Sequence, residues 1–242
     1  MRRRADIVLV EHGHFESRSR ARAAIEAGLV TADGVRVSRA SDLLGDEARI
    51  EAEAPHPWVS RGGVKLAAGL DAFGMEPAGK ICLDVGASTG GFTDVLLSRG
   101  AERVYSVDVG RGQLHPRIAA DPRVVALEAT DIRTVGPDQV PDAVALAVVD
   151  VGFISLRLVL PAVLDRMAPR AEIVALVKPQ FEAGRDRVGR GGIVRDEAVR
   201  QDVLRGVRAF AEGLGLMVRS TIASPIAGGD GNVEFLLAAD RG

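Results

Sequence analysis

The chain has 242 residues, 47% hydrophobic and 26% charged, so it can bury a sizeable core and form one ordinary domain plus a small one. Its formal net charge of −2 excludes a uniformly basic nucleic-acid-binding protein, so any RNA contact must come from local clusters among the 31 Lys and Arg residues. The single cysteine, Cys82, excludes a disulfide framework and a cysteine-based zinc site.

No apolar stretch in the sequence is long enough to span a membrane. The longest, Ala143 to Leu156, is interrupted by Asp150. The arginine-rich beginning is followed by too short an apolar stretch for a signal peptide. We therefore expect a cytoplasmic protein without membrane association.

The first 54 residues have the pattern of a small α+β domain. Residues 7–10 favour a short helix, and Ser17 can cap a second, arginine-rich helix that ends at Gly28. The Asp33-Gly34 turn predicts a β-hairpin, and residues 48–51 predict a further strand. We expect residues 1–54 to form this domain.

Arginines gather in the first forty residues, where eight arginines stand against five acidic residues. A local basic cluster of this kind is enough for salt-sensitive contacts with RNA phosphates. The alternative is a solvated helix face, because arginine runs on surface helices are common. The candidate RNA-binding residues of this region are Arg3, Arg4, Arg18, Arg20 and Arg22.

A linker over residues 55–59 separates this domain from a second one, residues 60–242. Pro55 and Pro57 stiffen it. Trp58, the single tryptophan, fits packing between domains better than base stacking. A helix capped by Ser60 follows, and it carries Lys65.

An apolar strand, residues 81–85, ends at a glycine-rich turn that leads into a helix. Such a turn lets backbone approach a nucleotide-type cofactor. Ser88 stands where a dinucleotide fingerprint needs its second glycine, and acidic residues at Asp84 and Asp108 fit S-adenosylmethionine better, with Asp108 accepting from the ribose hydroxyls. A structural turn without ligand is the alternative. The predicted cofactor-binding residues here are Asp84, Gly86, Ala87, Ser88, Gly90, Gly91, Phe92, Asp108 and Val109.

Beyond this turn, near-continuous apolar runs alternate with helical patterns, which predicts an α/β fold with a parallel sheet covered by helices on both faces. Ligands of such sheets bind at the carboxyl ends of the strands. Asp150 and Lys178 stand at two such ends, where they pair structurally or act chemically, and Asp131 and Ile132 are placed to contact an adenine ring. The predicted strands are 81–85, 103–107, 124–128, 143–149, 172–177, 217–223 and 233–239, and the predicted helices are 60–73, 90–99, 155–167 and 196–214.

A glycine- and arginine-rich loop, residues 182–195, follows Lys178 directly. A long loop beside an active centre commonly serves as a lid or a substrate contact. We expect it to close on RNA phosphates, with a disordered, non-contacting loop as the alternative. Its candidate RNA-binding residues are Arg185, Arg187 and Arg190.

The chain resembles a known family through motifs that occur together and in order: S-R-G-G-x-K-L, D-V-G-A-S-T-G-G-F, V-D-V-G, D-V-G-F-I-S-L, V-K-P-Q-F-E and G-N-x-E-F-L-L. They are similar to those of the TlyA, or haemolysin A, family of rRNA 2′-O-ribose methyltransferases, which join a ribosomal-protein-type RNA-binding module to an FtsJ-like, class I (Rossmann-like) methyltransferase domain. The resemblance implies S-adenosylmethionine as cofactor and cytidine in ribosomal RNA or ribosomal subunits as substrate. It places the family's catalytic tetrad on Lys65, Asp150, Lys178 and Glu234. From the residues themselves we expect no metal, since the two histidines His12 and His14 have no third partner in view.

The chemistry gives a reason for that tetrad. A ribose hydroxyl is a very weak acid, so methyl transfer needs its proton removed, and Lys178 is the candidate base. Desolvation and the neighbouring Lys65 would lower the pKa of Lys178, whereas Asp150 and Glu234 would oppose that shift. Two other functions stay open, a membrane-active haemolysin and a non-catalytic RNA-binding protein, and we expect a monomer.

Overall fold

The computed structural model describes residues 2–228 and 230–242, and the chain divides into two compact units, Met1–Pro57 and Trp58–Gly242. The division falls within the segment 55–59 that the sequence predicts as a linker. Each unit has its own apolar core.

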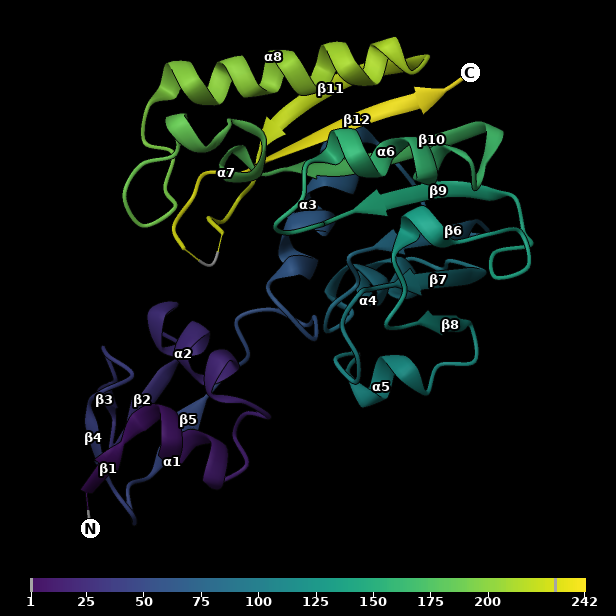
Figure 1. Cartoon of the computed structure of the whole chain (residues 1–242). Coiled ribbons are helices and arrows are strands. Elements are labelled where there is room, and N and C mark those ends of the chain that lie inside the picture. Colours follow the sequence, from purple (N-terminus) through teal and green to yellow (C-terminus); the bar gives the residue numbers. More distant parts are fainter. Residues whose placement is uncertain (1, 229) are drawn as a thin grey trace. The chain divides into compact units, whose positions relative to one another are not determined.

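The N-terminal unit packs two helices against short strands (Figure 1). Ser17 caps the second helix by accepting a hydrogen bond from the Arg20 amide, as the sequence predicts. The first strand pairs with the fourth, which the sequence did not predict because three consecutive arginines carry no strand periodicity. The elements are β1 (Arg2–Arg4), α1 (Ala5–Glu11), α2 (Arg18–Glu26), β2 (Val30–Ala32), β3 (Val35–Arg36), β4 (Leu43–Gly45) and β5 (Ile50–Ala52).

The second unit is built on a seven-stranded sheet in the order β11-β12-β10-β9-β6-β7-β8. Among these seven strands, β12 runs in the opposite direction to the other six: it pairs antiparallel with both β10 and β11, and the remaining pairings are parallel. The chain leaves β6 toward β7 and β8 and returns to β9 on the other side, so the order reverses beside β6. The strands are β6 (Ile81–Val85), β7 (Arg103–Val107), β8 (Val124–Leu127), β9 (Val144–Val149), β10 (Met167–Val177), β11 (Leu216–Ala223) and β12 (Phe235–Arg241).

Helices cover both faces of this sheet (Figure 1). One core joins α6 and α8 to one face, and a second joins α3, α4 and α5 to the other. The predicted doubly covered α/β fold is therefore confirmed. The helices are α3 (Gly62–Phe73), α4 (Gly91–Ser98), α5 (Pro116–Ala119), α6 (Leu156–Leu164), α7 (Pro179–Glu182) and α8 (Glu197–Gly213), with short 3-10 turns at Ile132–Thr134 and Arg185–Arg187.

Two predicted boundaries are wrong. The helix expected over 155–167 ends at Leu164, and the strand expected from residue 172 begins at Met167. Pro169 lies in the added part of β10, where the pairing with β9 shifts register between Met167 and Glu172, and such irregularities tolerate proline. Ser60 does not cap α3 either, since this helix begins after Arg61 without a side-chain cap.

Candidate functional site

A pocket of about 430 Å³ lies where the carboxyl ends of β6, β7, β9 and β10 meet, beside the reversal in strand order. This is the edge at which open α/β sheets bind ligands. Of the residues predicted for cofactor and catalysis, its lining contains Gly86, Ser88, Asp108, Val109, Asp131, Ile132, Asp150 and Lys178.

The turn after β6 takes its shape from Gly86. Its φ is +85°, and a Cβ there would collide with the backbone carbonyl of Asp150. Only glycine therefore lets the end of β6 lie against the end of β9. Ser88 also has a positive φ, +47°, and its amide donates to Asp108 Oδ2 at 2.7 Å.

The carboxylate of Asp108 has a fixed orientation at the end of β7. Besides the Ser88 amide, it accepts the Gly110 amide on Oδ1 at 2.7 Å. Asp131 is less available than predicted, because its carboxylate binds the Arg133 guanidinium, with 2.6 Å to one nitrogen, and accepts the Arg133 amide. Ile132 keeps its place in the pocket lining.

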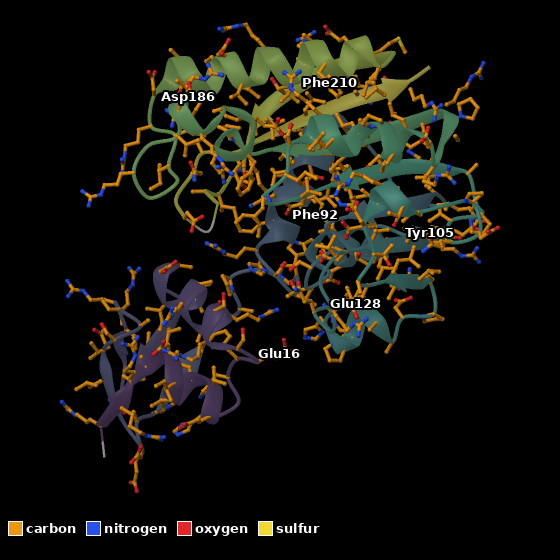
Figure 2. All side chains as sticks on the ribbon, viewed as in Figure 1. Glu16, Phe92, Tyr105, Glu128, Asp186 and Phe210 are labelled. Atoms are coloured by element: carbon orange, nitrogen blue, oxygen red, sulfur yellow. The ribbon has the colours of Figure 1, made fainter. Side chains whose placement is uncertain are left out.

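Five residues predicted to bind the cofactor lie outside the lining of this pocket. Phe92 is buried between α3 and α4 in the interior of the unit (Figure 2). A Cβ on Gly91 would collide with the Ser60 hydroxyl, and one on Gly90, whose φ is +88°, would crowd Leu114, so both glycines allow close packing. The five residues are Asp84, Ala87, Gly90, Gly91 and Phe92.

Asp84 is the most consequential of these. Its side chain is fully buried and accepts a hydrogen bond from the Thr93 hydroxyl at 2.6 Å. Thr93 in turn lies 2.8 Å from the Ser106 hydroxyl. Burial raises the pKa of Asp84 to about 7, above the usual range of an aspartate. Its side chain lies in the interior of the unit.

The four residues of the predicted tetrad form two ion pairs. Lys178 Nζ lies 2.6 Å from Asp150 Oδ1, and both side chains line the pocket. Lys65 Nζ, on α3, lies 2.5 Å from Glu234 Oε2, just before β12, and this second pair is buried outside the lining. The structure thus places one lysine–carboxylate pair in the pocket lining and the other, buried, outside that lining.

Phe153 is a residue that the sequence analysis missed. Its side chain is 95% exposed, its φ is +65°, and its ring centroid lies 5.2 Å from that of Phe181. It lines the pocket and also a neighbouring groove of about 490 Å³ whose walls include Leu158, Phe181 and Arg185. The signal that could have identified it is an aromatic residue in the loop that follows Asp150.

Glu128 was missed as well. It follows β8 directly (Figure 2), and its carboxylate accepts the amides of Gly112, Gln113 and Leu114 at 2.8 to 3.2 Å. These bonds lower the pKa of Glu128. They fix the loop that brings Val109 and Gln113 to the pocket.

The predicted RNA-binding arginines of the N-terminal unit are organised by acidic partners. Arg4, Arg18 and Arg22 converge on Asp6, whose side chain is fully buried, with nitrogen–oxygen distances of 2.7 to 3.0 Å. Each of the three guanidinium side chains stays about half exposed. Because three positive charges meet one negative charge, the cluster remains cationic. Arg3 binds Glu11 and Asp46 instead.

The glycine- and arginine-rich loop 182–195 has defined structure. Arg187 pairs with Asp202 of α8 at 2.5 Å. Arg185 and Arg190 have no ion pair within residues 2–228 and 230–242. Asn232, 1% exposed, accepts the Val194 amide at 3.0 Å and donates to the Gly192 carbonyl at 2.9 Å. The loop is therefore fixed at its C-terminal end, which the lid prediction did not anticipate.

Comparison with known proteins identifies both units. Residues 58–241 match the FtsJ-like methyltransferase family, and residues 3–50 match the S4 domain. The 16S/23S rRNA (cytidine-2'-O)-methyltransferase TlyA of Mycobacterium tuberculosis is 44% identical over 98% of this chain and 89% of its own length. Hemolysin A of Brachyspira hyodysenteriae is 38% identical over 96% of this chain and 98% of its own length.

A solved structure agrees with these matches. A Streptococcus thermophilus protein that carries the name hemolysin superposes with a TM-score of 0.78 at 41% identity, covering 99% of this chain and 88% of that one. In the part of the chain that the structure describes, no helix is long and apolar enough to cross a membrane. The same residues contain no group of three or more histidine, cysteine or acidic side chains that could hold a metal ion.

Proposed function

This chain belongs to the TlyA group of FtsJ-like methyltransferases, and we propose that it uses S-adenosylmethionine to methylate the ribose 2′-hydroxyl of a cytidine in ribosomal RNA. The observation that carries the proposal is the Lys178–Asp150 pair at one end of a cofactor-sized pocket. The relatives' names supply the substrate, and the S4 match supplies an RNA-binding unit.

The pocket fits the cofactor on its own chemistry. Asp108 presents a carboxylate that two backbone amides hold in place, suited to accept from the two hydroxyls of a ribose. Gly86 and Ser88 bring backbone close to the pocket, and Ile132 adds apolar surface for an adenine ring. When bound there, S-adenosylmethionine supplies an electrophilic methyl group.

The protein's own part in the reaction is to position the RNA and to accept a proton. Lys178, at the C-terminal end of β10, is the candidate base for the 2′-hydroxyl proton, and its pairing with Asp150 fixes its ammonium group at the pocket. The ammonium must first release a proton to solvent, and the resulting neutral amine then accepts the 2′-hydroxyl proton. We assign the Lys65–Glu234 pair to orienting the segment before β12 beside this site.

RNA contacts are proposed for each unit separately. The exposed ring of Phe153, beside an apolar groove, offers a stacking face for a nucleobase. Arg185, which lines the same groove, offers positive charge near it, and Arg190 belongs to the same loop. The cluster of Arg4, Arg18 and Arg22 offers a phosphate-binding surface on the N-terminal unit. We further propose a cytoplasmic monomer that docks on ribosomal subunits.

Methyl transfer from radiolabelled S-adenosylmethionine to unmodified ribosomal subunits tests this function. We expect label on a ribose 2′-oxygen, and a loss of about 10²- to 10⁴-fold in rate for Lys178→Ala, the range typical of a lost acid–base group. Lys80→Ala is the matched control, because Lys80 precedes β6 at the opposite edge of the sheet and pairs with Glu172. Cofactor binding without transfer to either subunit would contradict the rRNA assignment.

A further inference from the structure

Two segments, one after β9 and one after the neighbouring strand β10, are linked to each other at two points. The segment after β9, residues 150–156, meets the turn after β10, residues 178–182. The Lys178–Asp150 pair joins them at the pocket. At the other end, Glu182 Oε2 accepts the Ser155 hydroxyl at 2.6 Å and Glu182 Oε1 accepts the Leu156 amide at 2.7 Å. The second joint uses a residue outside the tetrad.

Glu182 completes the N-terminus of α6. Ser155 is the N-cap of this helix and accepts the Arg157 amide at 3.1 Å, while the Leu156 amide is satisfied by Glu182. A carboxylate suits this place because the first amides of a helix carry partial positive charge. Burial raises the pKa of Glu182, while its bonds to Ser155 and Leu156 oppose the rise. The two bonds thus hold a partly buried acid in one geometry.

Phe153 and Phe181 lie between these two joints. Their ring centroids are 5.2 Å apart, and Phe153 has the left-handed φ of +65° while its side chain is almost fully exposed. A non-glycine residue in that conformation is strained and persists only where its surroundings hold it. An exposed ring has few packing contacts of its own, so the ion pair and the hydrogen bonds on either side must hold this backbone conformation.

We propose that Glu182 is a positioning residue that clamps the segment after Asp150 to the turn after Lys178 and so holds Phe153 in the orientation that receives RNA. Glu182 itself touches neither RNA nor cofactor in this scheme. The inference rests on the proposed function, since it assigns Phe153 to the RNA side of the site. It adds a residue whose effect falls mainly on RNA use and less on cofactor binding.

Replacing Glu182 tests the clamp. Glu182→Leu removes both acceptors, and we expect kcat/KM for ribosomal RNA to fall about 30-fold, as for a buried hydrogen-bonding group left without its partner. Glu182→Gln keeps one acceptor oxygen and should lose less. The affinity for S-adenosylmethionine should fall much less than kcat/KM in both, because Gly86, Ser88, Asp108 and Ile132 line the rest of the pocket. Glu212→Leu, an exposed glutamate of α8 paired with Arg208, is the matched control.

Two further measurements separate the clamp from a general loss of structure. In a Phe153→Ala background, Glu182→Leu should cost little more, because its effect acts through Phe153. Hydrogen exchange should rise in residues 150–158 of Glu182→Leu and stay unchanged in α8. Additive losses, unchanged exchange in 150–158, or a parallel fall in cofactor affinity would each overturn the proposal. Hydrogen exchange tests the clamp even if the wild type methylates no RNA. A wild type that methylates no RNA would contradict the proposed function and would leave the clamp to be judged by exchange.

Discussion

At the scale of single residues, Asp84 shows how a motif position can belong to the core. It follows the apolar residues of β6 and precedes the glycine turn, where a ligand contact was predicted, yet it is fully buried against Thr93. In a strand, successive side chains point to opposite faces, so a residue near the end of a central strand can face the helix layer instead of the ligand. Sequence spacing alone does not show which face it takes.

The raised pKa of Asp84 predicts a pH-dependent stability. The folded protein holds the proton up to about pH 7, whereas the unfolded chain releases it near the ordinary aspartate pKa of 3.8. Between these values the folded state binds more protons, so the free energy of unfolding falls as pH rises, by about 4 kcal/mol at most, and is level above pH 7. Asp84→Asn lacks this dependence.

Urea unfolding of the wild type and Asp84→Asn at pH 5 and pH 8 measures the effect. The variant should gain stability relative to the wild type between the two pH values. Asp138→Asn, at an exposed aspartate, should show no such gain. An Asp84→Asn variant whose stability follows that of the wild type at both pH values would show that Asp84 is ionised throughout.

At the scale of elements, Asn232 decides whether the loop 182–195 behaves as a lid. Its amide bonds to Gly192 and Val194 are made at a side chain with 1% exposure, and Glu234 lies two residues further on. The loop is thereby tied to the segment that carries Glu234. A lid hinged at both ends would need to break these buried bonds to open.

Asn232→Leu should release that end of the loop. The arginines at 185, 187, 190 and 195 make the loop a trypsin target, so we expect cleavage there to quicken about tenfold or more, as for the loss of two buried hydrogen bonds. Cofactor affinity should not change, because neither partner lines the pocket. Gln201→Leu removes an exposed amide on α8 and is the control. Equal cleavage rates would show that the loop is held by other contacts.

Some elements of the fold and of the site could be predicted from the sequence. The strands Ile81–Val85 and Arg103–Val107 were predicted to the residue, because buried parallel strands are short apolar runs between turn signals. The two sides of the Lys178–Asp150 pair followed from the rule that strand ends meet at one edge. Glu182 and Asn232 could not be found this way, because their partners lie 26 to 40 residues away in the chain and depend on tertiary packing.

At the scale of the whole molecule, positive charge is concentrated in a local cluster of arginines, and the N-terminal unit as a whole is not basic. The N-terminal unit, Met1–Pro57, has nine arginines against ten acidic residues, so the basic excess counted to residue 40 does not extend over the unit. What distinguishes it is the convergence of Arg4, Arg18 and Arg22 on the buried Asp6. The arginines lower the pKa of Asp6, so its stabilising charge is present above the ordinary aspartate range and is lost only in strong acid.

This arrangement predicts that RNA affinity and cofactor affinity can be separated. The double variant Arg18→Ala/Arg22→Ala should weaken binding to ribosomal RNA and reduce the slope of log K against log salt by about 1–2, as expected when two phosphate contacts are lost. Its affinity for S-adenosylmethionine should match that of the wild type, because the pocket lies wholly in the second unit. Filter binding across a salt series and calorimetry measure the two quantities.

Two further variants separate a loss of RNA contacts from a loss of stability and from a loss of general positive charge. Losing two arginines leaves Asp6 buried with one partner, so adding Asp6→Asn removes the stranded charge and should restore stability without restoring RNA binding. Arg49→Ala removes an exposed arginine of the same unit, paired only weakly with Glu51 at 3.4 Å, and should change the salt slope less. If Arg49→Ala lowers affinity and slope as much as the double variant, the N-terminal unit attracts RNA by diffuse charge, and Asp6 does not assemble a binding surface.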